Sequence, residues 1–236
     1  MTVIDHPSPN HDPRAEGSRI DILVLHYTGM RTGKAALERL CDPEAKVSSH
    51  YLVEEDGRIF QLVDEARRAR HAGVSFWQGV SDVNSHSIGI EIVNPGHEWG
   101  YRPFPPAQMA VVRDLCRSIL SRHPIPPDRV VGHSDVAPAR KQDPGELFDW
   151  TGLAAAGIGP WPFADRVPPA PAGFDAETGL RHIGYGLGLV ADLAQTVTAF
   201  QRRFRPARID GVPDPETVDR IAAICQWKDH PIPLRR

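Results

Sequence analysis

Long apolar runs are missing from this 236-residue sequence, and neither sign of charge dominates it. The longest apolar stretches have four or five residues, as at 22–25, whereas a membrane-spanning helix needs about 20. The net charge is only -3, so no strongly basic surface is expected. These absences exclude a membrane span and give no indication of a nucleic-acid partner.

Cysteine is also scarce. Cys41, Cys116 and Cys225 are far apart, odd in number and outside any CxxC pair, so three reduced thiols are expected rather than a disulfide framework. The N-terminus has neither a basic start nor an apolar core, and it does not resemble a secretory signal. We therefore predict a cytoplasmic monomer. The periplasm or the outer membrane is the alternative if a signal has been trimmed from the chain.

Proline, by contrast, is abundant and clustered, with 23 residues. Apolar residues (41%) and charged residues (24%) otherwise occur in the proportions of an ordinary globular protein, which leaves proline to mark linkers. We predict an N-terminal arm at 1–17, a main domain at 18–160, a Pro-rich linker at 161–176 and a small helical domain at 177–236.

Short strands and helices alternate along the main domain. Apolar runs and alternation predict strands at 20–27, 49–53, 58–63, 87–93 and 129–132. Helices are predicted at 34–41 and 106–123, and Asp56-Gly57 predicts a hairpin between the second and third strands. This interleaving favours an α/β fold with a mixed central sheet flanked by helices, followed by a C-terminal three-helix domain.

Two histidines stand where predicted strands end. His26 closes the first strand, and His133 directly follows the last one. Strand ends are where a rigid scaffold meets an open cleft. Asp143 comes ten residues after His133, and two imidazoles with one carboxylate form a common shell for catalytic zinc. Read alone, the histidines could equally be hydrogen-bonded core residues, and Asp143 an ordinary turn residue.

Six blocks of sequence occur in order between residues 18 and 160. They are LHYT at 25–28, SSHYLV at 48–53, DG at 56–57, HAGVS at 71–75, Asn84 with SIGIE at 87–91, and GHSDVAP at 132–138 leading to RKQDPG at 140–145. In this set the sequence resembles the zinc-dependent N-acetylmuramoyl-L-alanine amidases, the amidase-2 family related to phage T7 lysozyme and animal peptidoglycan recognition proteins. Asp143 stands where those phage and animal relatives carry Cys, so the resemblance is strongest to the AmpD and AmiD types.

The resemblance implies an activity and a site. The activity is hydrolysis of the amide bond between N-acetylmuramic acid, or its 1,6-anhydro form, and L-alanine in peptidoglycan fragments during cell-wall recycling or turnover. The site would hold Zn²⁺ on His26, His133 and Asp143, with Glu91 as general base and Lys141 as donor to the developing oxyanion. Glu91 lies in a strand among isoleucines, where it faces either a polar site or solvent.

Four more residues in matching blocks are predicted substrate contacts, namely His50, His71, Asn84 and Arg140. Arginine is the natural bidentate partner of the carboxylates on a peptidoglycan stem peptide. Arg70 departs from the family pattern, because the recycling enzymes usually carry Trp there. Phe76 and Trp77 could stack on a sugar or pack in the core.

The C-terminal region resembles a small peptidoglycan-binding domain in the stretch VTAFQRRF at 197–204 and in Asp210-Gly211. Such a domain either binds glycan or serves as a packing partner, and the residues leave both open. The alternative for the whole chain is a non-catalytic peptidoglycan-recognition protein of the same fold. Relatives of that kind typically lose a zinc ligand, whereas all three positions are filled here.

Overall fold

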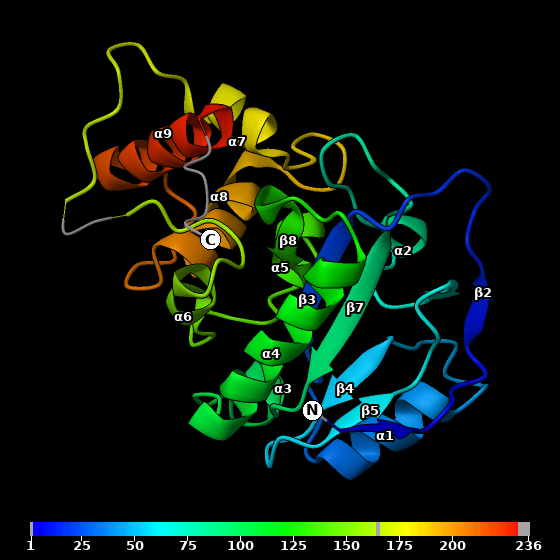
Figure 1. Cartoon of the computed structure of the whole chain (residues 1–236). Helices are drawn as coiled ribbons and strands as arrows, with labels where there is room; N and C mark the ends of the chain where they lie inside the picture. The colour runs from blue at the N-terminus through cyan, green and yellow to red at the C-terminus, as the bar shows by residue number, and fades with distance from the viewer. Residues whose placement is uncertain (1, 164–165, 231–236) are drawn as a thin grey trace.

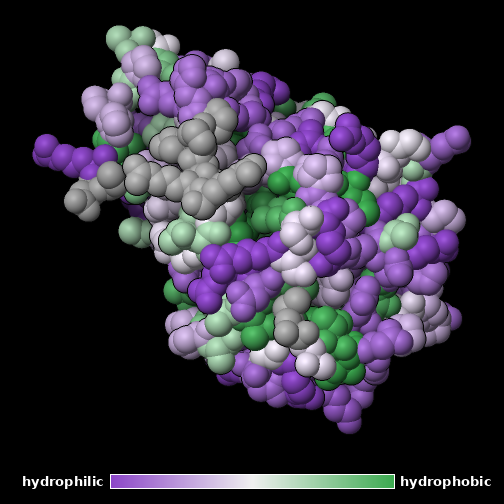
Figure 2. All heavy atoms as spheres, in the orientation of Figure 1, coloured by the Kyte–Doolittle hydropathy of each residue, from purple (hydrophilic) through white to green (hydrophobic). Residues whose placement is uncertain are grey.

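The computed structural model describes residues 2–163 and 166–230 (Figure 1). Residues 164–165 of the predicted linker and 231–236 of the predicted helical domain lie outside the described residues, as does residue 1. Within the described ranges, no helix has the length and apolar character needed to cross a membrane. On the face seen in Figure 2, polar side chains predominate and separate the apolar ones into patches.

A six-stranded mixed sheet forms the centre of the molecule, which confirms the predicted fold class. β3 (Ile22–Tyr27) pairs in parallel with β7 (Ser87–Ile92) and with β8 (Val130–Gly132). The hairpin predicted at Asp56-Gly57 joins β4 (Tyr51–Val53) to β5 (Ile59–Gln61), and β4 pairs in parallel with β7. The predicted strands are therefore present, each shorter by one to three residues.

Alternation along β3 and β7 divides the sheet into two different faces. Leu23 and Leu25 point to one face, while Ile22, Val24 and His26 point to the other. On β7 the isoleucines share the face of Leu23, and the small or polar residues share the face of His26. One face is thus uniformly apolar, and the other carries the polar residues near the strand ends.

The apolar face is covered by α4 (Pro106–Arg122), the longest helix of the main domain (Figure 1). Its buried residues Val112, Leu115, Cys116 and Ile119 join the cluster formed by the sheet. A proline begins the helix, where its missing N–H is not needed. The other helix predicted in this domain is α1 (Gly33–Cys41), capped by Thr32. Short helices and turns complete the domain, namely α2 (Val83–His86), α3 (Gly96–Trp99), η1 (Pro127–Arg129), α5 (His133–Val136) and α6 (Trp150–Ala155).

The N-terminal arm is part of the fold and not a detached segment. β1 (Val3–Asp5) extends the central sheet beside β5, and β2 (His11–Pro13) pairs with β6 (Arg67–Ala69). Between them Ser8 and Asn10 are buried, and their side chains donate to backbone carbonyls in and after α1. The arm looks unstructured in the sequence because its polar residues satisfy distant backbone groups, which leaves no local apolar pattern.

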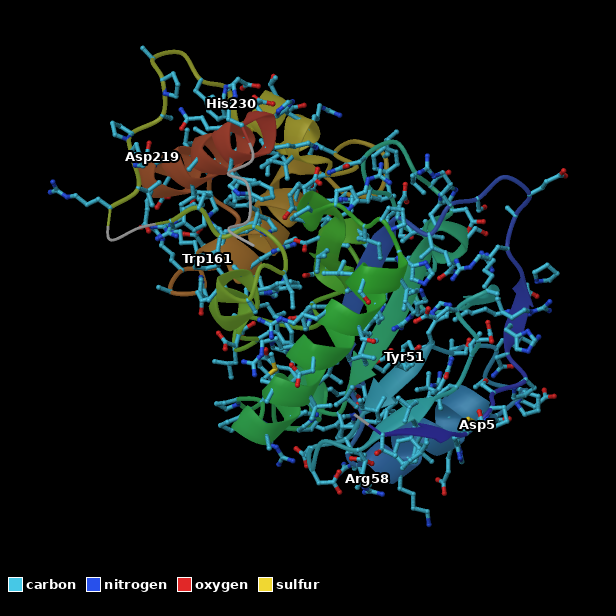
Figure 3. All side chains as sticks on the ribbon, viewed as in Figure 1. Asp5, Tyr51, Arg58, Trp161, Asp219 and His230 are labelled. Carbon is cyan, nitrogen blue, oxygen red and sulfur yellow. The ribbon has the colours of Figure 1, made fainter. Side chains whose placement is uncertain are left out.

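The C-terminal region contains the three predicted helices, α7 (Ala176–Ile183), α8 (Leu193–Phe204) and α9 (Pro215–Asp229). Phe200 of α8 and Ile221 of α9 belong to the same buried cluster as Ile22 and Val24 of β3. Trp161, labelled in Figure 3, packs against Phe204 with ring centroids 6.1 Å apart. The helices therefore share an apolar core with the sheet. The division into domains at residues 160 and 177 stays a prediction.

A shared core predicts that damage to α8 destabilises the whole chain. Phe200→Ala should lower the free energy of unfolding by about 3–5 kcal/mol, because the side chain is fully buried and leaves a cavity. Chemical denaturation followed by fluorescence and circular dichroism should show one transition at a lower midpoint. Leu189→Ala is the control, since that side chain is 70% exposed and should change stability by less than about 0.5 kcal/mol. Two separate transitions, only one of them shifted, would contradict a shared core.

Candidate metal centre and active site

The polar face of the sheet ends in a cluster of ionisable side chains. His26 is the penultimate residue of β3, and Glu91 lies directly beside it on β7. His133 begins α5 immediately after β8. Because β3, β7 and β8 are parallel, their carboxyl ends meet at one edge of the sheet. The strand ends predicted to carry chemistry are therefore brought together.

Three acceptor atoms converge at this edge. Nδ1 of His26 lies 2.9 Å from Nδ1 of His133, and Oδ2 of Asp143 lies 3.0 Å from each of them. All three side chains are buried, with at most 5% of their surface exposed. The trio is a group that could hold a metal ion, as the sequence predicts. Two nitrogens and one carboxylate oxygen match the donor set of a catalytic zinc site, which leaves a fourth position open.

The partners of the outer nitrogens favour lone pairs on the inner nitrogens of the two histidines. Nε2 of His133 lies 3.1 Å from the backbone oxygen of Ala72, which can only accept, so Nε2 holds the proton. Nε2 of His26 lies 3.0 Å from Nδ1 of His71, and Nε2 of His71 lies 3.1 Å from Oγ of Ser87. When His26 donates along this chain, both inner Nδ1 atoms face Asp143 as acceptors. Three acceptors around one point favour a bound cation, and contacts to the outer nitrogens of this kind orient metal ligands.

The electrostatics of the cluster agree with this assignment. Burial, followed by the nearby His133, lowers the pKa of His26 to about 4, so its imidazole is neutral at pH 7. Burial alone would raise the pKa of Asp143. The adjacent rings of His133 and His26, which favour the ionised carboxylate whenever they are protonated, outweigh that effect and hold the pKa well below its usual range. A neutral imidazole and an ionised carboxylate are the forms that bind metals.

A cavity of about 370 Å³ lies in front of the three residues His26, His133 and Asp143. Glu91 and Lys141, which are predicted to be catalytic, both line this cavity. Oε2 of Glu91 has no hydrogen-bond partner among the described residues. Burial, followed by the charge of Asp143, raises the pKa of Glu91 well above its usual value. A carboxylate whose pKa is moved toward neutrality is suited to accept and return a proton.

The four predicted substrate contacts divide into two pairs. His71 and Arg140 line the cavity, although His71 also supports His26. His50 is fully buried and bonds through its Nδ1 to the N–H of Gly89, while Oδ1 of Asn84 accepts from the N–H groups of His71 and Ala72. His50 and Asn84 therefore bond to the backbone inside the fold and are not among the residues that line the cavity.

Gly89 explains how a histidine ring fits against the sheet. A Cβ atom at Gly89 would lie 2.5 Å from the ring of His71, which is closer than any real contact. The glycine in β7 therefore makes room for His71, which in turn reaches His26. Its place in the alternation with isoleucine is the signal in the sequence that this face of the strand receives another side chain.

Two further cations belong to the cavity wall: Arg39, which the motifs do not include, and Arg70, which the sequence marks only as a departure from the family pattern. Arg39 from α1 and Arg70 from the end of β6 line it together with Arg140 and Lys141. Arg70 is held by Asp12 of the arm, with Nη2 2.7 Å from Oδ1. Arg39 has no carboxylate partner among the residues that the structure describes. The four cations outnumber the two carboxylates of the lining, Glu91 and Asp143, which favours an anionic ligand.

The aromatic pair left open by the sequence is also placed. Trp77 is buried, contacts Tyr185 edge-on at 5.0 Å between ring centroids, and donates through Nε1 to the backbone oxygen of Asp128. Trp77 is therefore a core residue that joins the sheet domain to the helical region. Phe76 is half-buried and packs near Gly186, outside the cavity lining.

Converging metal-ligand atoms beside an unpartnered carboxylate, at the base of an open cavity, are the features of a hydrolase with one catalytic metal ion. Residues 16–146, more than half of the chain, match the family model described as N-acetylmuramoyl-L-alanine amidase. The chain belongs to this family of amidases and is an enzyme of that class.

Some relatives match most of this chain, and others match a smaller share of it. N-acetylmuramoyl-L-alanine amidase AmiD of Escherichia coli is 40% identical over 225 residues, which covers 84% of this chain and 80% of the relative. The 1,6-anhydro-N-acetylmuramyl-L-alanine amidase AmpD of Enterobacter cloacae is 35% identical over 162 residues, covering 61% of this chain and 84% of the relative. The crystal structure of AmpDh3 from Pseudomonas aeruginosa in complex with anhydromuramic pentapeptide is similar with a TM-score of 0.80, at 35% identity, and covers 90% of this chain and 93% of that one.

The raised pKa of Glu91 predicts a pH dependence of stability in metal-free protein. Because the folded pKa lies above the ordinary value of about 4.3, this group's contribution is fully present below that value and is lost as pH rises through the folded pKa. The slope that it adds cannot exceed about 1.4 kcal/mol per pH unit. Glu91→Gln should remove this loss, so its free energy of unfolding relative to wild type should rise with pH.

The measurement is urea denaturation of both chelator-treated proteins at a series of pH values from 4 upward. Taking the difference between the two proteins cancels the titration of groups that they share. Stability curves that stay parallel over the whole range would show that Glu91 has an ordinary pKa.

Proposed function

We propose that this enzyme uses zinc, held by His26, His133 and Asp143, to hydrolyse the amide bond between N-acetylmuramic acid and L-alanine in peptidoglycan fragments. The observation that carries the proposal is the convergence of the three buried acceptor atoms within 3.0 Å of one another beside the unpartnered Glu91. Zinc at such a site supplies Lewis acidity, which makes water more acidic and polarises the scissile carbonyl.

The chain's own residues then handle the proton and the charge. Glu91 takes a proton from the attacking water and returns it to the amine nitrogen of the leaving L-alanine. Its raised pKa fits both directions of this transfer. Lys141, two residues before Asp143 on the cavity wall, places an ammonium group where the carbonyl oxygen gains negative charge.

The substrate that we propose is a muropeptide, with the 1,6-anhydro form of the sugar included. Its stem peptide carries carboxylates, and the cavity has Arg39, Arg70, Arg140 and Lys141 in its wall. The similarity to a structure that holds anhydromuramic pentapeptide supports the same class. A cytoplasmic location, with the periplasm or outer membrane as its alternative, and a monomeric state both stay predictions.

Removal of the metal should abolish hydrolysis. A chelator, or Asp143→Ala, should reduce the turnover of an anhydro-muropeptide more than about 100-fold, because several kcal/mol of transition-state stabilisation are lost. Chromatography of the released peptide measures turnover, and elemental analysis measures bound zinc. His182→Ala is the control, since His182 pairs with Asp229 on the surface away from the cavity. Full activity in a chelated, metal-free protein would exclude the proposal.

Glu91→Gln should separate the chemical step from metal binding. The amide keeps the shape of the side chain but cannot accept a proton, so kcat should fall by about 10²–10⁴-fold while bound zinc stays unchanged. Steady-state kinetics and metal analysis on the same preparation test this. A kcat within about threefold of wild type would remove Glu91 from the role of base.

A further inference from the structure

We infer that the helical region positions the metal ligands: Arg203 of α8 fixes α5, which begins with His133 and is bonded to the loop that carries Asp143. The contacts cross between the two regions of the chain. This inference rests on the proposed function only in that it takes His133 and Asp143 as metal ligands. It assigns the helical region a part in the site that does not involve binding glycan.

Arg203 is a buried cation that reaches from α8 into the sheet domain. It is 4% exposed, and its Nη1 lies 2.7 Å from Oδ2 of Asp135, while Nη2 donates to the backbone oxygen of Val130 at 3.0 Å. The guanidinium carbon lies 4.0 Å from the ring centroid of Trp150. Arg203 thus contacts both β8 and α5, the two elements that flank His133.

Asp135 is the residue of α5 that Arg203 contacts. Its Oδ2 also accepts from the N–H of Gly132 at 2.8 Å, and its Oδ1 accepts from the hydroxyl of Tyr185 at 2.8 Å. Tyr185, like Arg203, belongs to the helical region. A fully buried carboxylate needs such partners, since an unpaired charge in the interior is costly. Two of the three side-chain and backbone donors to Asp135 therefore come from the helical region.

α5 has only four residues, so its own hydrogen bonds cannot hold its direction. His133 is its first residue and Asp135 its third. Fixing the carboxylate of Asp135 consequently fixes the turn from which the imidazole of His133 projects. The apolar residues of α8 would bury the helix in any case, whereas the buried arginine adds a directional contact at this one turn.

The same constraint extends to Asp143. The N–H of Ser134 donates to the backbone oxygen of Asp143 at 2.9 Å, which ties α5 to the loop that carries the carboxylate ligand. Farther along that loop, Glu146 lies 3.7 Å from Nε of Arg202 and 3.1 Å from Nε2 of His97. Adjacent arginines of α8 therefore reach the chain segments of two of the three ligands.

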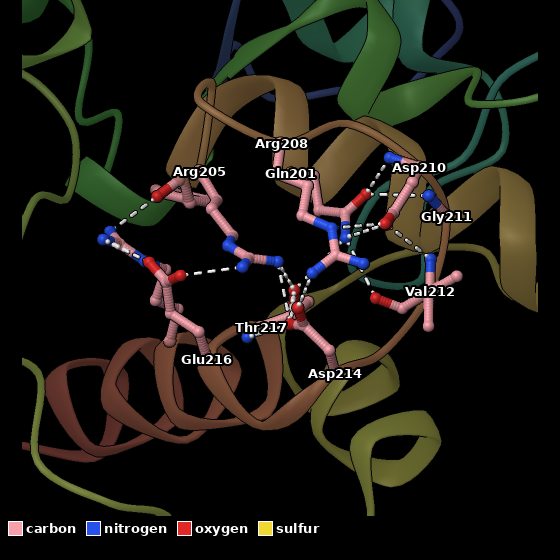
Figure 4. A network of polar contacts seen from close by, with 11 residues as sticks. Gln201, Arg205, Arg208, Asp210, Gly211, Val212, Asp214, Glu216 and Thr217 are labelled. Carbon is pink, nitrogen blue, oxygen red and sulfur yellow. Dashed lines mark hydrogen bonds and ion pairs between the residues drawn. The ribbon is translucent and has the colours of Figure 1, made fainter.

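The chain offers a matched control two residues farther on. Arg205 is also buried, and its ion pairs join Asp214 at 2.8 Å and Glu216 at 2.7 Å (Figure 4). It also donates to Oγ1 of Thr217 at 2.9 Å, and all of these partners lie within the helical region. Arg205→Met breaks an ionic network comparable to that of Arg203 without touching residues 130–146.

The test is zinc affinity of the full-length chain, measured by competition with a chromophoric chelator. Arg203→Met should weaken zinc binding by about 10–100-fold, as expected when a contact that orients a ligand is lost. Arg203→Lys should recover part of that loss, and Tyr185→Phe should weaken binding in the same direction. Arg205→Met should lower the melting temperature but leave zinc affinity within about threefold of wild type.

The outcomes separate this inference from the proposed function. Wild-type affinity in Arg203→Met and Tyr185→Phe would overturn the inference, and so would equal losses in Arg203→Met and Arg205→Met at matched loss of melting temperature. If Arg203→Met does not fold, Arg203→Lys and Tyr185→Phe decide the result.

A wild-type chain that binds no zinc would refute the proposed function and not the inference. Amide hydrogen exchange of metal-free protein then decides the positioning role. Exchange over 132–136 should be faster in Arg203→Met and Tyr185→Phe than in Arg205→Met, and equal exchange would overturn it.

Discussion

The carboxylate of Asp143, buried between the Nδ1 atoms of His26 and His133, is the contact on which the site depends. Three acceptors in one buried place repel one another unless a cation joins them. The surrounding structure keeps them there by fixing both rings from behind, through the backbone oxygen of Ala72 and the ring of His71. The fold thus holds three acceptor atoms in an arrangement that favours a bound cation.

The two faces of the sheet have different roles: one supplies the apolar core, and the other carries the candidate site residues. The isoleucines of β7 and the leucines of β3 pack beneath α4, where a continuous apolar cluster supplies the driving force for folding. The alternate positions carry His26, Gly89 and Glu91. Polar residues can project from this face only because neighbouring segments satisfy or surround them. The cavity with its cationic wall lies beside Glu91, whose Oε2 has no hydrogen-bond partner among the described residues.

The helical region packs on the same face of the sheet and makes both apolar and polar contacts with it. Its apolar residues complete a core with Ile22 and Val24, and its buried Arg203 meets Asp135 beside His133. A region that resembles a separate module by composition therefore shares both the core and the polar network of the catalytic domain.

Local patterns in the sequence predict the alternation of β3 and β7, the helices α1 and α4, the hairpin at Asp56-Gly57 and a C-terminal region of three helices, all of which the structure contains. The resemblance of the ordered motifs to the amidase family predicts the group of His26, His133 and Asp143, which the structure brings together, and the roles of Glu91 and Lys141 stay predictions. The helices, strands and hairpin follow from periodicity and turn residues, which are local properties. The folded chain alone reveals that the arm adds strands, that His50 and Asn84 bond to backbone groups, and that Arg203 pairs with Asp135. Each of those depends on a partner far away in the chain. Because a polar side chain satisfied by a distant backbone or charge leaves no periodic trace, its role becomes visible only when the chain is folded.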